Sequence, residues 1–262
     1  MRIELSGKLA LVTGSSGIGK AIANGLAATG ADVIVNGRRQ QSVDTAIQYI
    51  KASVAGARVR GVAADVSSAE GCSVLLTAVP AVDILVNNAG VFEPKSFFDI
   101  PDEDWLRLFQ INVMAGVRLS RAYMPAMLSR NWGRIVFISS ESALNIPNEM
   151  IHYGSTKAAE LAIARGLAQL TAGTAVTVNS VLPGPTLSDG VEAFLEKMAK
   201  RLGKPVDEMA ADFIKNYRPT SLLQRFARVE EIANMVVYTA SMEASATNGA
   251  ALRVEGGVIQ TI

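Results

Sequence analysis

The sequence has few cysteines, few histidines and almost no net charge, and each shortage excludes a class of protein. Cys72 is the only cysteine among 262 residues, so neither an intrachain disulfide nor a cysteine-based metal site is expected. His152 is the only histidine, and we expect no bound metal. Lys and Arg number 25 against 24 Asp and Glu, a net charge of +1, which argues against nucleic acid or an anionic membrane as the main partner.

Long hydrophobic runs are also missing. No apolar stretch reaches the roughly 18 residues of a membrane span, and the first residues, Met1–Lys8, lack the apolar segment of a signal peptide. The sequence therefore predicts a cytoplasmic protein that does not enter a membrane.

What the sequence has is a regular alternation of strand and helix patterns. Short runs rich in Val, Ile and Leu without polar alternation are typical of parallel strands covered on both faces. They lie at Lys8–Thr13, Asp32–Asn36, Val59–Ala64, Asp83–Asn87, Arg134–Ser139, Ala175–Leu182 and Ala250–Val254. Helical patterns separate them at Gly17–Thr29, Gln41–Ser53, Ala69–Ala78, Asp102–Leu128, Met150–Thr171, Val191–Tyr217 and Val229–Ser241. Repeated strand–helix units predict a Rossmann-type α/β fold, a doubly wound seven-stranded parallel sheet with helices on both faces, in one domain over residues 1–262.

One segment departs from this alternation. Between Pro183 and Phe226 the pattern is helical, without a strand, and is interrupted at Gly203-Lys204-Pro205 and Arg218-Pro219. Insertions after the carboxyl end of a strand lie beside the ligand crevice of such sheets. We interpret residues 185–226 as a substrate lid of two or three short helices; a purely structural cap is the alternative.

A glycine-rich turn follows the first expected strand and opens the first helix. Gly14, Gly17 and Gly19 allow close approach to a pyrophosphate, and the helix N-terminus supplies free N–H groups. The spacing differs from the usual dinucleotide fingerprint, but the strand–turn–helix context is the required one. A tight turn that merely packs helix on strand is the alternative.

The end of the second expected strand indicates which dinucleotide binds. Sites for NAD usually carry an acid there, whereas this sequence has Gly37 followed by Arg38 and Arg39. Arg38 can bind a 2′-phosphate through a forked, charge-assisted contact. NADP(H) is therefore favoured over NAD(H).

Tyr153 and Lys157 lie four residues apart, on one face of an expected helix. A neighbouring cation stabilises a phenolate and lowers the tyrosine pKa from its usual value near ~10 toward the pH where proton transfer is effective. Ser140 precedes the pair, at the carboxyl end of an expected strand. By itself this spacing is common, and an exposed polar helix face is the alternative.

Together, these residues resemble the short-chain dehydrogenase/reductases over essentially the whole chain. The matching motifs, in order, are Thr13-Gly14-x-x-x-Gly17-Ile18-Gly19, Asp65-Val66, Asn87-Asn88-Ala89-Gly90, Asn112, Ser140, Tyr153-x-x-x-Lys157, Pro183-Gly184-Pro185-Thr186 and Asn248-Gly249 with Val254-Glu255-Gly256-Gly257.

The resemblance implies a catalytic set of Asn112, Ser140, Tyr153 and Lys157. Tyr153 would exchange a proton with the substrate oxygen as hydride moves, and Lys157 would lower the pKa of Tyr153 and hold the nicotinamide ribose. Ser140 would hydrogen-bond the substrate carbonyl. Asn112 would hold a relay water.

The resemblance also implies a cofactor-binding set. Asp65 and Val66 would contact the adenine, Asn87 would brace adjacent strands, and Thr186 would bind the carboxamide. The whole set is Gly14, Ser16, Gly17, Ile18, Gly19, Arg38, Asp65, Val66, Asn87, Ala89, Gly90, Tyr153, Lys157, Pro183, Gly184 and Thr186.

Two residues next to this set are open to interpretation. His152 lies about 100° round the helix from Tyr153, so we expect it to line the site or a subunit contact and not to act in catalysis. Glu141 follows Ser140, and we expect it to point to solvent or a subunit contact; recognition of a substrate amine or hydroxyl is the alternative.

The function expected is an NADP(H)-dependent oxidoreductase that interconverts a small-molecule carbonyl and a secondary alcohol. One alternative is a 3-oxoacyl-carrier-protein reductase, for which Arg121, Arg130 and Arg134 would form a basic docking surface. A non-catalytic NADPH-sensing protein is the alternative from another class. The resemblance further implies a homotetramer in which the helices Asp102–Leu128 and Met150–Thr171 pair between subunits.

Overall fold

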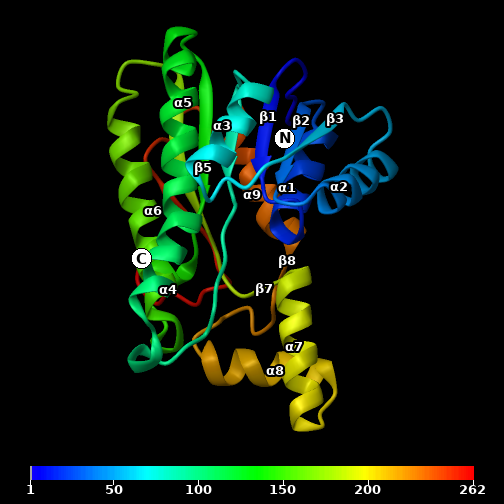
Figure 1. Cartoon of the computed structure of the whole chain (residues 1–262), viewed down its shortest axis with the longest axis vertical. Coiled ribbons are helices and arrows are strands. Elements are labelled where there is room, and N and C mark those ends of the chain that lie inside the picture. Colours follow the sequence, from blue (N-terminus) through cyan, green and yellow to red (C-terminus); the bar gives the residue numbers. More distant parts are fainter. Residues whose placement is uncertain (1) are drawn as a thin grey trace.

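A seven-stranded parallel sheet forms the centre of the molecule in the computed structural model, which describes residues 2–262 (Figure 1). The strand order is β3-β2-β1-β4-β5-β6-β9. The strands are β1 (Leu9–Thr13), β2 (Asp32–Gly37), β3 (Val59–Ala63), β4 (Ile84–Asn87), β5 (Gly133–Ile138), β6 (Val176–Pro183) and β9 (Ala251–Val254). Each expected strand is present to within a residue or two, and the predicted doubly wound fold is confirmed.

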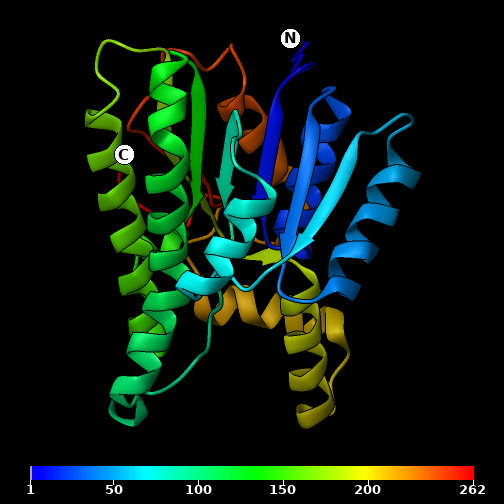
Figure 2. The ribbon, with the colours of Figure 1, turned by 45° about the horizontal axis from the view of Figure 1, so that its top comes forward.

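Helices cover both faces of the sheet. On one face lie α1 (Gly17–Ala28), α2 (Gln40–Ser53) and α9 (Val229–Ala240), and on the other lie α3 (Ala69–Ala78), α5 (Ala115–Ser129) and α6 (Ile151–Gln169) (Figure 2). Because every central strand is covered on both sides, its successive residues are all buried, which explains the continuous apolar runs in the sequence.

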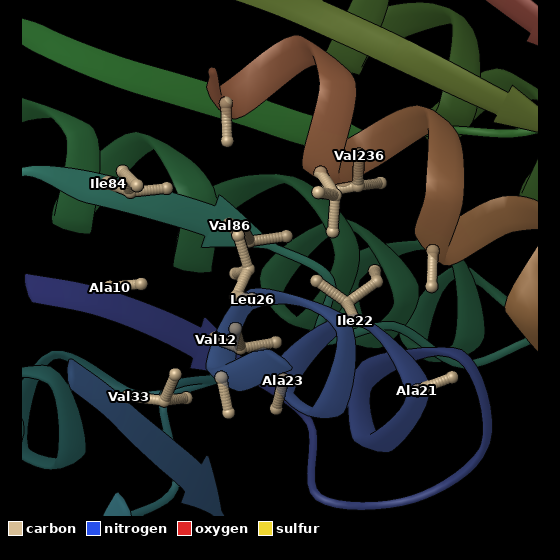
Figure 3. Packing of buried hydrophobic residues seen from close by; sticks show 14 of the residues in the cluster. Ala10, Val12, Ala21, Ile22, Ala23, Leu26, Val33, Ile84, Val86 and Val236 are labelled. Atoms are coloured by element: carbon tan, nitrogen blue, oxygen red, sulfur yellow. The ribbon is translucent and has the colours of Figure 1, made fainter. Parts of the chain in front are cut away.

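The core on the α1 side shows how this packing is made. Ile22 and Leu26 of α1 are fully buried and lie against Val12 of β1 and Val86 of β4, with Val236 of α9 beside them (Figure 3). The same strands send Leu11 and Leu85 into a second core cluster on the other face. The two clusters fix the sheet between its helical layers, and hence the place where its strands end.

The expected helix Asp102–Leu128 is not continuous. It consists of α4 (Asp102–Phe109), a π-helical turn at Gln110–Met114 and α5. A π-helical turn inserts one residue into the helical spacing and is found mostly at functional sites. The turn contains Asn112, so the irregularity lies at a residue of the expected catalytic set.

The segment after β6 forms an arm that extends past the carboxyl ends of the strands (Figure 1). It contains α7 (Asp189–Leu202) and α8 (Val206–Tyr217), which we call the α7–α8 arm. The helix boundary at Gly203 was predicted, but the prediction of no strand here is wrong. Two-residue strands β7 (Thr186–Leu187) and β8 (Ala227–Arg228) pair in parallel and close the base of the arm.

Arg134 is a core residue and not part of a basic surface. Its side chain is 1% exposed and donates to the carbonyls of Gly133 (2.9 Å), Ala175 (2.8 Å) and Ser241 (3.2 Å). Arg130 lies 3.5 Å from Asp83, so its charge is also partnered. The prediction that Arg134 belongs to a basic docking surface is therefore wrong. The pairing of Arg130 with Asp83 reduces the positive charge that Arg130 could add to such a surface.

The described residues show neither a membrane-spanning helix nor a metal-binding cluster. None of the helices in residues 2–262 is long and apolar enough to cross a membrane. Within the same residues, no three His, Cys, Asp or Glu side chains are grouped so that they could hold a metal ion.

The buried Arg134 gives a stability prediction. We expect Arg134→Met to lower the free energy of unfolding by about 2–4 kcal/mol, since three carbonyls, two of them in buried hydrogen bonds, lose their donor while the apolar stem is kept. Arg121→Met, the same change at an exposed position of α5, should stay within about 0.5 kcal/mol of the parent protein. Urea denaturation followed by circular dichroism measures both values, and equal values for the two variants would refute the structural role of Arg134.

Candidate active site

A cavity of about 470 Å³ lies at the carboxyl edge of the sheet. Its walls come from the loops after β1, β4, β5 and β6, from the start of α6 and from the α7–α8 arm. Open parallel sheets bind ligands at this edge, where the strand order reverses, here between β1 and β4. Twelve residues of the expected sets line the cavity: Gly14, Ser16, Gly17, Ile18, Ala89, Gly90, Ser140, Tyr153, Lys157, Pro183, Gly184 and Thr186.

Six expected residues do not line this cavity: Gly19, Arg38, Asp65, Val66, Asn87 and Asn112. Arg38 and Asp65 are exposed beyond its rim, at the ends of β2 and β3. Val66 is 4% exposed and its side chain packs in the second core cluster, so the expected adenine contact stays a prediction that concerns its backbone.

The glycine turn after β1 has the shape of an anion-binding cradle. Gly14 has φ of +96°, and a Cβ there would lie 2.5 Å from the side-chain nitrogen of Asn88. A Cβ at Gly19 would lie 2.2 Å from the Gly14 carbonyl. The Gly17 N–H, at the start of α1, points to the Asp189 carboxylate at 3.4 Å. The turn thus already offers a donor to an anionic oxygen, as a helix N-terminus should.

Thr13 and Asn88 join β1 to β4 beneath this turn. The Thr13 hydroxyl accepts from the backbone N–H groups of Asn88 and Ala89, both at 2.9 Å, and Asn88 donates to the Thr13 carbonyl at 2.8 Å. The bracing role expected of Asn87 is wrong in detail, since Asn87 donates to Ser120 of α5 at 3.1 Å. The sequence signal for Asn88 was present, but ordinary turn chemistry explained it equally well.

Lys157 is buried and held in place from two sides. Its Nζ donates to the Ile138 carbonyl at the end of β5 (2.9 Å) and to the Glu160 carboxylate (2.9 Å). The ammonium lies 5.8 Å from the centre of the Tyr153 ring, so the helix places both groups on one face, as the four-residue spacing predicts.

Glu160 is a site residue that the sequence reasoning missed. It is 2% exposed and lies three residues after Lys157, a spacing that could have identified it. Burial raises the pKa of Glu160 to about 7, although the Lys157 charge opposes this. Burial alone would lower the pKa of Lys157, but Glu160 and Tyr153 more than offset it and the pKa is raised.

The pKa of Tyr153 is also raised in this structure, contrary to the expected direction. Burial of the phenol is the largest cause, and the Glu141 and Glu160 carboxylates add to it. Lys157 opposes these effects and lowers the pKa, so its expected contribution has the right sign. That contribution does not prevail, because burial of the phenol is the larger effect.

Asn112 joins the π-helical turn to two neighbouring segments. Its Oδ1 accepts from Val91 N (2.9 Å), and its Nδ2 donates to the Val91 carbonyl (3.0 Å) and to Thr156 Oγ1 (2.9 Å). Both ends of the amide therefore hold the loop after β4, and Nδ2 ties it to α6 at Thr156, the residue before Lys157. A relay water held by this residue stays a prediction.

Glu141 is buried, so the expectation that it points to solvent or a subunit contact is wrong. It is 4% exposed and pairs with Arg218, the residue after α8, with 2.8 Å between Oε1 and Nε. Arg218 also contacts Glu149 at 3.1 Å. From the sequence, Arg218 was expected only to interrupt a helix. Nothing in the local pattern indicates that it pairs with Glu141, which lies 77 residues away.

His152 neither lines the cavity nor reaches the surface of this chain, so its expected position is wrong. Its side chain is fully buried and packs edge-on against Trp105 of α4, with 5.8 Å between ring centres. Burial lowers the pKa of His152, so the imidazole is neutral at pH 7. The expectation that Lys157, and not His152, is the partner of Tyr153 agrees with this geometry.

The outer wall of the cavity is apolar and aromatic. Phe213 of α8 stacks on Phe226 and Tyr217, with ring centres 5.5 and 5.0 Å apart. Phe194 and Met198 of α7 line the same wall. The cavity thus combines a polar floor at the strand ends with an apolar wall from the arm.

Comparisons with known proteins define the class. The sequence model described as short chain dehydrogenase matches residues 8–199. The uncharacterized oxidoreductase YvaG of Bacillus subtilis (strain 168) is 50% identical over 263 residues, covering 100% of both chains. The 3-oxoacyl-[acyl-carrier-protein] reductase FabG of Aquifex aeolicus (strain VF5) is 32% identical, covering 98% of this chain and all of the relative.

A solved structure also matches over the whole length of the chain. L-sorbose reductase from Gluconobacter frateurii, complexed with NADPH and L-sorbose, superposes with a TM-score of 0.93 and is 32% identical, each chain being covered completely. The chain therefore belongs to the short chain dehydrogenase family. It is an oxidoreductase of that family, of the class that acts on CH–OH groups with a nicotinamide dinucleotide.

The residues present fit such a dinucleotide. Gly14 and Gly19 of the turn leave no space for a Cβ, and Gly17 presents an N–H that already meets a carboxylate. Tyr153 and Lys157 line the same cavity as Gly14 and Gly17, so one ligand can extend from the turn to the phenol.

Proposed function

We propose that this chain is an NADP(H)-dependent oxidoreductase that interconverts a carbonyl and a secondary alcohol, with Tyr153 as the acid and base. The convergence of Ser140, Tyr153 and Lys157 on the cavity that begins at the glycine turn carries this proposal. No single motif would support the proposal by itself, because each of these residue spacings is common in proteins.

In this mechanism the side chains handle the proton. The bound dinucleotide supplies or accepts the hydride. The Tyr153 hydroxyl donates its proton to the carbonyl oxygen during reduction, or accepts the alcohol proton as a phenolate during oxidation. Ser140 donates a hydrogen bond to the same oxygen and stabilises the charge that develops on it. Lys157, held by Ile138 and Glu160, stabilises the phenolate that remains.

The proposed preference for NADP(H) rests on Arg38. Its side chain is exposed at the end of β2, next to Gly37, where an NAD site usually has an acid. A guanidinium there can grip a 2′-phosphate with two parallel hydrogen bonds. Asp32 does not serve as that acid, since it lies at the start of the strand and pairs with Arg58.

The charges lining the cavity support an uncharged substrate. Its cations are Lys157 and Arg218, and both are engaged, the first with Glu160 and the second with Glu141 and Glu149. A carboxylate or phosphate on the substrate would find no unpaired cation among these lining residues and would lose its hydration without compensation. The aromatic wall suits an apolar group beside the carbonyl.

The alternatives receive less support. A 3-oxoacyl-carrier-protein reductase would need a basic docking surface, and burial of Arg134 removes the centre of the one that the sequence suggested. A non-catalytic NADPH sensor needs no phenol beside a buried ammonium, yet Tyr153 and Lys157 are both present in that arrangement.

The remaining expectations are kept as proposals. The α7–α8 arm walls the cavity, which supports its role as a substrate lid. Leu106 and Phe109 of α4 are 67% and 43% exposed, which supports pairing of this helix between subunits of a homotetramer. Cytoplasmic location stays a prediction from the sequence.

Replacement of Tyr153 tests the proposed function. We expect Tyr153→Phe to lower turnover by roughly 10²–10⁴-fold, because the proton donor is lost, while NADPH binding is unchanged. NADPH absorbance would be followed against ketones, β-keto esters, sugars, steroids and an acetoacetyl thioester, and NADPH affinity would be measured by fluorescence. Tyr49→Phe, an exposed tyrosine of α2, is the matched control. Full activity in Tyr153→Phe, or NADPH binding without turnover of any substrate by the parent protein, would reject the proposal.

Replacement of Arg38 tests the cofactor preference. Loss of a charge-assisted contact worth about 1.5–3 kcal/mol should weaken NADPH binding by roughly 10–100-fold. We therefore expect Arg38→Ala to raise the Kd for NADPH by that factor and to leave the Kd for NADH unchanged, as measured by calorimetry. The exposed Lys51→Ala on α2 controls for the loss of one positive charge. If the parent protein binds NADH at least as tightly as NADPH, Arg38 has another role.

A further inference from the structure

The hydroxyl of Ser140 is held by its own neighbours before any substrate arrives. Its Oγ donates to Oε2 of Glu141 at 2.5 Å and accepts from the backbone N–H of Ser142 at 3.1 Å. Both contacts are buried. At a surface, a serine side chain can rotate and its single hydroxyl hydrogen can turn freely. The two contacts hold the Ser140 oxygen in one position and direct its hydrogen toward Glu141.

Glu141 is in turn held by Arg218, the residue that directly follows the α7–α8 arm. Arg218 donates from Nε to Glu141 Oε1 at 2.8 Å. The Arg218 side chain is 6% exposed and the Glu141 side chain is 5% exposed. The other branch of Arg218 contacts Glu149 at 3.1 Å and the Tyr217 carbonyl at 2.7 Å. A buried carboxylate without a cation would be strongly disfavoured, so this arrangement requires that the arm be docked.

We propose that Glu141 and Arg218 are positioning residues, which hold the Ser140 hydroxyl for the substrate oxygen and make its position depend on docking of the α7–α8 arm. This inference rests on the proposed function, since it concerns how the carbonyl-binding serine is prepared.

The hydrogen bonds allow the serine to change partner at little loss. When a carbonyl arrives, the Ser140 hydrogen turns about the Cβ–Oγ bond from Glu141 toward the substrate, and Oγ keeps its contact with the Ser142 N–H. Oε2 of Glu141 keeps two donors, the Ser142 N–H at 2.8 Å, which it shares with Ser140 Oγ, and the Ser142 hydroxyl at 3.1 Å. Arg218 also draws the carboxylate charge toward Oε1, which weakens the competition of Glu141 for the serine hydrogen.

The same contacts argue against direct recognition of the substrate by Glu141. Oε1 faces Arg218, and Oε2 already accepts from three donors. A substrate amine or hydroxyl would have to displace one of these buried partners. Glu141 therefore acts through Ser140, and its effect on the reaction should disappear when the serine hydroxyl is absent.

A double-mutant cycle on kcat tests this dependence. Ser140→Ala should lower kcat by roughly 10²–10³-fold and Glu141→Gln by roughly 10-fold, each without changing NADPH affinity. The double variant should lie within about twofold of Ser140→Ala, because residues that act through one another are not additive. Glu196→Gln, the same change at an exposed position of α7, is the control. Multiplicative effects of the two substitutions would overturn the inference.

Amide hydrogen exchange tests the link to the arm without relying on turnover. Arg218→Met should speed exchange in α8 by at least roughly tenfold relative to the parent protein and should lower kcat as Glu141→Gln does. Arg218→Lys, which restores the charge but not the forked geometry, should recover part of both losses. Unchanged exchange in α8 would overturn the role of Arg218. If the parent protein turned over no carbonyl at all, the proposed function would fail, whereas the exchange result would still stand.

Discussion

The buried ammonium of Lys157 is the constraint on which the rest of the site depends. It lies below the surface with two partners, the Ile138 carbonyl at the carboxyl end of β5 and the Glu160 carboxylate one helical turn along α6. Removing one member of a buried pair leaves an uncompensated charge and typically costs about 3–5 kcal/mol. Strand β5 and helix α6 are therefore held in fixed register at the point where Ser140 and Tyr153 emerge. The charge that fixes this geometry is the same charge that acts on the Tyr153 phenol, so structure and proton affinity are set together.

The cavity adds a second layer to this arrangement. The ends of the strands supply backbone donors and small residues at the Gly14–Gly19 turn, which suits the anionic part of a dinucleotide. The α7–α8 arm supplies an apolar wall, and through Arg218 it also reaches the polar floor. Both cations in the lining are paired with carboxylates, and the proposal of an uncharged substrate rests on this pairing. In the proposed function, the polar floor carries proton transfer and the separate apolar wall carries substrate recognition.

The sequence predicts local arrangements well and distant ones poorly. The strands, the glycine turn and the placement of Tyr153 and Lys157 on one helix face follow from short-range periodicity, and the structure agrees. Glu141 was expected at the surface and is buried, because its partner Arg218 lies 77 residues away and no local pattern marks the pair. Glu160 is different, since its spacing from Lys157 is local. Only the structure shows that Glu160 is buried beside Lys157 and that it opposes the lowering of the Tyr153 pKa by the lysine. Side-chain networks that join separate elements are thus the part that periodicity does not contain.

The central claim is that the Lys157 charge lowers the pKa of Tyr153 against the effect of burial, and that Glu160 partly neutralises this charge. The most direct measurement is the pH dependence of kcat/KM for alcohol oxidation in the parent protein and in Glu160→Gln. Because the Glu160 carboxylate raises the pKa of Tyr153, its removal should shift the ascending limb to lower pH. A limb that stays in place or moves to higher pH would contradict the account. Complete loss of the limb would also contradict it, since Glu160 itself would then be the titrating base.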